Sequence, residues 1–245
     1  MVHLAMMRPS SQVQIRPLQF DQDILHDLRQ FGPENDQAEY AMLKIDHLAI
    51  ACTSLTEGVA ALEQALSLTL SPGGEHPHMG THNRLLSLGP DEYLEVIAIN
   101  PDAPGPDQPR WFDLDNFNGA PRLTNWICGT TDLDAAVLSA PRGTGKPWDL
   151  ARGDLAWRMA IPKDGKLPFQ NGFPALIQWK GSAHPAPRLM DQGIRLRHLT
   201  IAHPQAAELT AALAGMISDP RIEIIQADAF AMSATLDTPG GTKTI

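Results

Sequence analysis

Residues 44–51 read Lys-Ile-Asp-His-Leu-Ala-Ile-Ala, and residues 92–97 read Glu-Tyr-Leu-Glu-Val-Ile. Apolar side chains alternate and β-branched or aromatic residues cluster in both stretches, which predicts two strands. His47 and Glu95 are the polar side chains that these strands would turn toward a core. Burying either one without a partner would cost roughly several kcal/mol. A shared divalent metal is one such partner, because histidine nitrogen and carboxylate oxygen are common ligands.

A predicted helix and two short strands separate these two stretches. Ser54 is placed to cap the helix, with Glu57 three residues later, and apolar residues then follow at helical spacing. A turn is predicted at residues 71–74, before the two short strands. Residues 45–99 therefore read as a β-α-β-β-β unit, with histidine on its first strand and glutamate on its last.

The unit recurs along the chain. Residues 122–180 read as a second β-α-β-β-β unit, and aligning the two helices sets Asn125 opposite His47. A third strand and helix begin near residue 195, and His198 aligns with His47 there without a gap. We find no obvious fourth strand for this third unit. Two complete units side by side would enclose a cleft, which is where a ligand is expected.

The fold class predicted is therefore α+β, with repeated β-α-β-β-β units whose mixed, curved sheets enclose a cleft, plus a partial third unit. We divide the chain into an N-terminal appendage at 1–42, a two-unit domain at 43–190 and a partial β-α-β-β unit at 191–245. The domain comprises the units at 44–100 and 122–180.

Composition excludes several partners. The 19 basic and 28 acidic residues give a net charge of −9, which argues against nucleic acid. No apolar run approaches the roughly 18 residues of a membrane span, and no secretory signal is evident, so we expect neither a membrane nor export. Cys52 and Cys128 are interpreted as buried free thiols of a cytoplasmic protein, with a disulfide left open. The glycines near Lys146 lack the spacing of a phosphate loop, so no nucleotide cofactor is expected.

Three motifs together carry a family resemblance. The sequences DHLAIA at 46–51, GGEHPHMGTHNRLLSLG at 73–89 and YLEVIAINP at 93–101 resemble the glyoxalase-like branch of the vicinal oxygen chelate superfamily, and PALIQW at 174–179 also fits that branch. The resemblance covers roughly residues 44–190. It implies two paired units that hold a metal between their first and last strands.

Carried over residue by residue, the resemblance implies that His47 and Glu95 form the first pair of ligands. The second pair departs from the family pattern, since Asn125 stands at the histidine position. Either Ile177 or Gln178 stands at the glutamate position, because a slip of one residue turns a strand side chain to the other face. Asparagine and glutamine are weak neutral ligands, so a four-ligand site is in doubt.

Two sources of a further ligand stay open. His198 of the third unit is one, and a histidine of the 71–85 hairpin, His76 or His82, is the other. With His47 and Glu95, one further histidine would form a facial triad suited to zinc, nickel, manganese or iron. The competing interpretation is that His47 donates to Glu95 or to a backbone carbonyl and that no metal binds.

Polar residues near the expected cleft are the candidates for binding substrate. In the first unit the candidates lie on the predicted hairpin at 71–85. In the second unit one lies on the first strand and two lie on the last strand. These candidates are His76, Thr81, Asn83, Arg84, Asn125, Gln178 and Trp179.

Two functions from different classes follow. The first is a metal-assisted lyase or isomerase, or a dioxygenase if the metal is iron, acting on a small oxygenated substrate with Glu95 and His47 as catalytic residues. The alternative is a metal-free protein that binds or sequesters a small molecule in the same cleft. The uncovered edge of an incomplete third unit is compatible with a homodimer.

Overall fold

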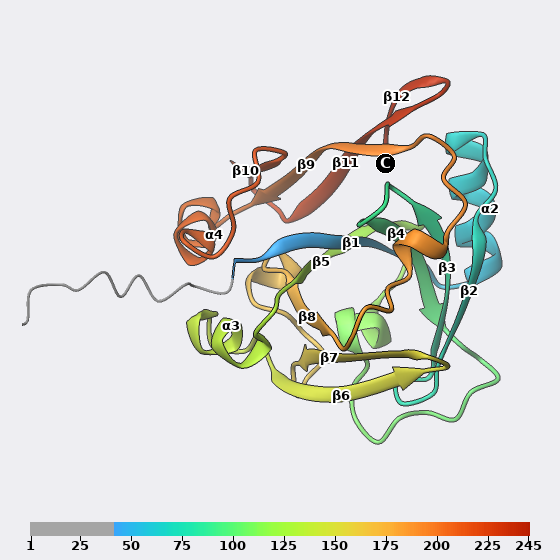
Figure 1. Cartoon of the computed structure of the whole chain (residues 1–245). Coiled ribbons are helices and arrows are strands. Elements are labelled where there is room, and N and C mark those ends of the chain that lie inside the picture. Colours follow the sequence, from blue (N-terminus) through green and yellow to red (C-terminus); the bar gives the residue numbers. More distant parts are fainter. Residues whose placement is uncertain (1–41) are drawn as a thin grey trace, which may run out of the picture. The chain divides into compact units, whose positions relative to one another are not determined.

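A computed structural model describes residues 42–245 of the chain (Figure 1). The N-terminal appendage predicted for residues 1–42 therefore lies outside the described residues, apart from Met42. The described elements form three successive units, each of which begins with a strand followed by a helix.

The first unit confirms the predicted β-α-β-β-β order. Ser54 caps its helix, because the Glu57 backbone N–H donates to the Ser54 hydroxyl over 3.4 Å. The turn predicted at 71–74 is wrong, since these residues begin a strand. The elements are β1 (Lys44–Ala51), α2 (Leu55–Leu66), β2 (Ser71–His76), β3 (Thr81–Ser87) and β4 (Tyr93–Ile99).

The second unit repeats this order after a connecting 3-10 segment, η1 (Trp111–Asn116). A second 3-10 turn, η2 (Phe169–Asn171), precedes its last strand. The elements are β5 (Arg122–Gly129), α3 (Leu133–Ser139), β6 (Lys146–Arg152), β7 (Leu155–Ile161) and β8 (Ala175–Trp179).

These two units share one eight-stranded sheet in the order β2-β3-β4-β1-β5-β8-β7-β6. The first strands β1 and β5 run antiparallel at its centre, and each is parallel to the last strand of its own unit. The sheet curls so that its two edges approach, because a methyl group added to Gly74 of β2 would lie 2.8 Å from a guanidinium nitrogen of Arg152 on β6. One chain therefore supplies both halves of the cleft, and the predicted homodimer is not needed to complete it.

The third unit forms a separate four-stranded sheet, ordered β10-β9-β11-β12. Its β10 lies directly beside β9 in parallel, whereas the parallel neighbour of β1 is the last strand of the unit. It also has a fourth strand that we did not predict, because the exposed residues of β12 lack apolar alternation. The elements are β9 (Arg195–His203), α4 (Ala206–Leu213), β10 (Ile222–Gln226), β11 (Ala231–Thr238) and β12 (Gly241–Thr244).

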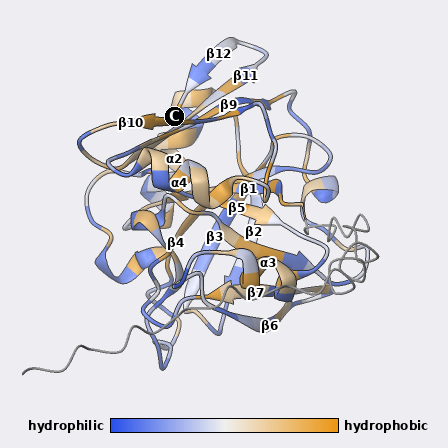
Figure 2. Cartoon of the chain, turned by 90° about the vertical axis from the view of Figure 1, so that its left-hand side faces the viewer, coloured by the Kyte–Doolittle hydropathy of each residue, from blue (hydrophilic) through white to orange (hydrophobic). Residues whose placement is uncertain are grey.

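The two faces of the eight-stranded sheet have separate cores. Leu48 of β1 and Trp126 of β5 point outward, into a core shared with α2, α4 and the four-stranded sheet. In the hydropathy view, β12 is coloured hydrophilic and stands away from this core (Figure 2). Ala49 and Ile127 point inward, into the second core. Alternation along each strand therefore determines which side chains reach the inside of the curl.

Two sequence expectations concern single features. Cys52 and Cys128 are buried and free in the structure. Within residues 42–245 no helix combines the length and the apolar character that crossing a membrane requires.

Candidate active site

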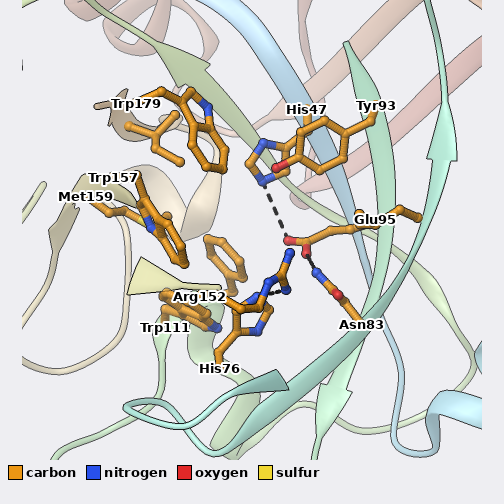
Figure 3. Close-up of a pocket in the computed structure, with 13 residues that line it drawn as sticks. His47, His76, Asn83, Tyr93, Glu95, Trp111, Arg152, Trp157, Met159 and Trp179 are labelled. Carbon is orange, nitrogen blue, oxygen red and sulfur yellow. Dashed lines mark hydrogen bonds and ion pairs between the residues drawn. The ribbon is translucent and has the colours of Figure 1, made fainter. Parts of the chain in front are cut away.

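A small pocket opens on the inner face of the eight-stranded sheet, between its two halves (Figure 3). His47 and Glu95 of the first unit face Trp157 and Trp179 of the second across it. The cavity measures about 40 Å³. Since a water needs roughly 10–15 Å³ of such volume, the cavity has room for a group of about three water-sized atoms.

A β-bulge in β1 brings Asp46 beside His47. Two residues of β1 advance against one of β5 between Ile45 and His47, so Asp46 is the additional residue. Neighbouring strand residues normally point to opposite faces, and a bulge redirects one of them. As a result, His47 Nδ1 lies 2.6 Å from a carboxylate oxygen of Asp46, and both side chains are buried.

The other oxygen of Asp46 is also occupied. It accepts the indole N–H of Trp179 over 2.9 Å and lies 3.2 Å from His184 Nε2. These hydrogen bonds and the neighbouring His47 outweigh burial and hold the pKa of Asp46 well below its usual range. Asp46 is therefore a fixed carboxylate that orients His47, in the way that carboxylates orient catalytic and metal-bound histidines.

His47 turns its other nitrogen toward Glu95, with 3.6 Å between Nε2 and Oε1. Burial alone would lower the pKa of His47, but contacts with Asp46 and Glu95 raise it to about 9. Burial is likewise outweighed at Glu95, where the contact with His47 lowers the pKa. Tyr93 stacks on the imidazole with ring centroids 4.3 Å apart. At neutral pH the pair is therefore an imidazolium beside a carboxylate.

Asn83 holds the second oxygen of Glu95. Its amide N–H donates to Glu95 Oε2 over 2.7 Å, while its amide oxygen accepts the Gly74 N–H over 2.9 Å. The backbone of β2 lies so close that a methyl group on Gly73 would sit 2.2 Å from the Asn83 carbonyl oxygen. Gly73 and Gly74 therefore belong to a bulged strand that packs against Asn83, and not to the turn that we predicted.

His76 is held between Thr81 and Arg152. His76 Nδ1 lies 3.0 Å from the Thr81 hydroxyl oxygen, and His76 Nε2 lies 3.1 Å from Arg152 Nη1. Because a guanidinium only donates, Nε2 must be the acceptor and Nδ1 must carry the proton. Burial lowers the pKa of His76 to about 4, with the charge of Arg152 among the further causes. His76 is therefore neutral and fixes the position of Arg152.

The second unit resolves the slip between Ile177 and Gln178. Ile177 lines the pocket, whereas Gln178 faces outward and caps α3, accepting the Leu133 N–H over 3.2 Å. Asn125 is fully buried and faces the inner core, but it does not line the pocket. Its side-chain atoms have no hydrogen-bond partner among the described residues.

Two further candidates lie elsewhere. Arg84 is exposed on the outer face of β3 and borders a surface hollow beside α2. His198 lies on β9 of the four-stranded sheet and contacts Glu223 over 3.1 Å. The structure therefore brings His47, Glu95, His76, Asn83 and Trp179 to one pocket, with Thr81 behind His76. It brings neither Arg84 nor His198 to them.

The residues present do not fit the divalent ion that the superfamily commonly uses. Among the described residues, His47 and Glu95 are the two of ligand type that meet at one point, since the nitrogens of His76 are engaged by Thr81 and Arg152. The matching positions of the second unit carry Asn125 and Ile177. Within residues 42–245 no three His, Cys, Asp or Glu side chains are grouped to hold a metal ion. The nearby guanidinium of Arg152 would also repel a dication.

Sequence reasoning missed several pocket residues. Asp46 adjoins His47, but only the bulge makes it a partner. Tyr93 reads as an ordinary strand aromatic, and Trp157 reads as core. Arg152 precedes a turn glycine and carries no local signal. Asp46 and His184 were also missed, and they lie behind His47 without lining the pocket. The lining residues not predicted as site residues are Leu85, Tyr93, Trp111, Phe112, Arg152, Trp157 and Met159.

Paired β-α-β-β-β units that share one curled sheet are the architecture of the vicinal oxygen chelate fold. Residues 45–217 match the family described as Glyoxalase-like domain. The match spans more than half of the chain, so the protein belongs to this family, and the resemblance seen in the sequence is confirmed. A comparison with curated proteins finds no match.

Several solved structures are similar to this chain at low identity. A hypothetical protein from Staphylococcus aureus is 12% identical, with a TM-score of 0.54, over 77% of this chain and 88% of that one. Methylmalonyl-CoA epimerase from Streptomyces coelicolor, in complex with 2-nitronate-propionyl-CoA, is 17% identical over 58% of this chain and 99% of that one (TM-score 0.38). The Mycobacterium tuberculosis epimerase is 17% identical over 57% and 88%, respectively (TM-score 0.38). Such likeness concerns the fold alone.

Proposed function

We propose that the protein is a glyoxalase-like isomerase or lyase that moves a proton on the carbon next to the carbonyl group of a small oxygenated substrate. The observation that carries the proposal is the buried pair of His47 Nε2 and Glu95 Oε1, 3.6 Å apart at one small cavity. An acid and a base at this spacing suit two neighbouring atoms of one substrate.

The roles follow from the protonation states. Glu95, a carboxylate at neutral pH, removes the proton from the carbon that bears a hydroxyl group. The electron pair of that C–H bond forms a carbon–carbon double bond, and the carbonyl oxygen takes a proton from His47 Nε2. The resulting enediol returns by the same steps reversed on the neighbouring carbon. No oxidant or reductant is consumed.

Neighbouring residues prepare both groups. Asp46 fixes the imidazole from behind, and Asn83 fixes the carboxylate, so neither group must reorganise during the reaction. Aromatic rings of Trp111, Trp157 and Trp179 wall the cavity on the other side. They exclude water, which strengthens each electrostatic contact inside.

The metal-assisted form of this function, with dioxygenase chemistry as its iron variant, requires donors that the second unit does not provide. No step of the proposed reaction therefore uses a metal. The metal-free binding protein is the second candidate, and the loss of the second ligand pair at Asn125 and Ile177 favours it. It shares the pocket but predicts that a bound compound keeps its protons.

Proton exchange separates the two candidates. Dihydroxyacetone, hydroxyacetone, pyruvate and hydroxypyruvate are incubated with the protein in D₂O, and NMR follows deuterium entering the carbon beside the carbonyl. We expect exchange above the buffer rate that Glu95→Gln abolishes. Glu75→Gln is the matched control, because Glu75 is exposed on β2. A compound that binds without exchange in the unsubstituted protein would overturn the isomerase proposal in favour of the binding protein.

A further inference from the structure

Arg152 is the charged residue of the pocket to which the proposed proton transfer assigns no role. It ends β6, and its guanidinium group lines the cavity with the tryptophans (Figure 3). Within residues 42–245 its side chain has one hydrogen bond, to His76 Nε2, and no carboxylate pairs with it. By contrast, Arg158 and Arg188 each pair with an aspartate over 2.7 Å.

The absence of a counter-ion is unusual for this position. Glu95, the nearest acidic side chain of the pocket wall, is engaged with His47 and Asn83. A half-buried guanidinium that lacks a carboxylate partner retains its charge, since arginine does not deprotonate in proteins. An anionic ligand would supply the missing partner.

The guanidinium group is also held in a fixed position. His76 binds Nη1 and is itself held by Thr81, and the group packs against the backbone of β2 at Gly74. Only one of its nitrogens is engaged, which leaves a pair of N–H groups for a carboxylate. Arginine recognises carboxylates through two parallel hydrogen bonds of this kind.

A second donor lies beside it. Trp111 is 5% exposed and lines the same cavity, and its indole N–H is buried with no partner among the described residues. His76 contacts Trp111 edge-on, with ring centroids 5.1 Å apart. Buried polar groups are rarely left unpaired, so Trp111 indicates an acceptor atom in the cavity.

We infer that Arg152 and Trp111 bind the carboxylate of the substrate, which places its oxygen-bearing second carbon at His47 and Glu95. The substrate class is then a small 2-oxo carboxylic acid with a hydroxyl group on its third carbon, so that its 2-oxo oxygen faces His47 and its third carbon faces Glu95. The cavity of about 40 Å³ holds about three waters, so the part of the acid that enters it is compact. This inference rests on the proposed function for the end of the molecule that reacts, but the anion site stands on its own contacts.

Binding of pyruvate and of its neutral amide, pyruvamide, tests the inference. Titration calorimetry and ligand-observed NMR measure both affinities for the full chain. We expect the unsubstituted protein to bind pyruvate at least tenfold more tightly than pyruvamide. Arg152→Gln should remove this preference by weakening pyruvate alone. Arg84→Gln is the matched control, since Arg84 lies outside the pocket, and it should change neither affinity.

Two further variants keep the test decisive if Arg152→Gln does not fold. Arg152→Lys keeps the charge but loses the paired N–H groups, and we expect an affinity for pyruvate between those of the unsubstituted protein and Arg152→Gln. Trp111→Phe keeps the ring and loses the N–H, and it should weaken pyruvate severalfold.

Three results would overturn the inference: equal binding of pyruvate and pyruvamide, no binding of pyruvate at millimolar concentrations, or unchanged pyruvate affinity in both Arg152 variants. Glu95→Gln distinguishes this failure from a failure of the proposed function. If Glu95→Gln and the unsubstituted protein bind pyruvate equally and neither exchanges the protons of hydroxypyruvate, the anion site stands and the proton transfer falls.

Discussion

The two halves of the eight-stranded sheet have the same order of elements and different chemistry. The first unit carries the acid–base pair, at His47 on its first strand and Glu95 on its last. The second unit carries Asn125 and Ile177 at the corresponding places, and its contribution to the pocket is apolar apart from Arg152. The fold needs only inward-facing side chains at these places, so a site can reside in one half.

The repeated order of strands and helices therefore does not determine the chemistry of the site. Pairing of β1 with β5 requires alternation and hydrogen bonds, which Asn125 provides as well as His47 does. β5 has a bulge of its own, at Thr124 beside Asn125, so the two halves differ in the side chains that support the site. The first half adds Asp46 beside His47, and the hydrogen bond from Gly74 to Asn83. Exchanging or removing single side chains in the two halves therefore tests the assignment directly.

The largest effect is expected at His47, and Asn125 at the corresponding position of the second unit is the comparison. His47→Gln removes the proton donor, and we expect proton exchange to slow by about 10²–10⁴-fold, the usual contribution of general acid–base catalysis. Asn125→Ala should leave exchange within about threefold, because Asn125 does not line the pocket. NMR exchange rates measure both, with thermal unfolding to confirm that each variant is folded. Equal losses in the two variants would contradict a site confined to the first half.

The second prediction concerns stability at alkaline pH. The pKa of His47 is raised from 6.5 to about 9 in the folded protein, so its contribution is complete below pH 6.5 and is lost as pH rises through 9. The free energy of unfolding should fall by about 3 kcal/mol across this window. Urea titrations between pH 6 and 10 measure the fall.

His47→Gln should flatten this alkaline dependence, and His198→Gln, at an exposed histidine of the third unit, should leave it unchanged. The acid side has the opposite sign. Since contacts in the folded protein lower the pKa of Asp46 and Glu95, their contribution is present above pH about 4 and is lost as pH falls further. A profile of the same slope in His47→Gln would show that another group titrates.

Much of the fold was predictable from the sequence, because strand alternation and helix capping are local. The β-α-β-β-β order and the Ser54 cap follow from neighbours in the chain. The polar pair of the site was predictable, because His47 and Glu95 are each recognisable within the sequence of a single strand. Arg152 reaches the pocket because the sheet curls until β6 meets β2, and no local pattern encodes that approach.

The errors have the same origin. Gly73 and Gly74 read as a turn because glycine favours turns, yet the close approach of Asn83 requires them within a strand. His198 matches His47 in sequence, but the third unit orders its strands differently and joins another sheet. Gln178 was a candidate ligand in the sequence, but the register of β8 points its side chain toward α3.

A smaller effect is expected from Gln178→Ala in the second half. Gln178 accepts the Leu133 N–H and donates to the Thr131 carbonyl, so the variant loses the cap of α3 and should be destabilised by about 1 kcal/mol. Proton exchange should not change, because Gln178 faces away from the pocket. Denaturant unfolding and the exchange assay measure the two effects, and lost exchange in a folded variant would return Gln178 to the site.

The smallest effect is expected from removing metal. With one pair of donors in the first half and none in the second, the site lacks the ligands that hold a transition metal firmly. Treatment with EDTA should leave proton exchange and the unfolding temperature unchanged, and elemental mass spectrometry of protein purified without chelator should find zinc, nickel, manganese and iron well below one equivalent. One equivalent of any of these metals, lost in both His47→Ala and Glu95→Ala, would contradict this. It would mean that the two halves cooperate after all, through a ligand that moves into the pocket from its present partners.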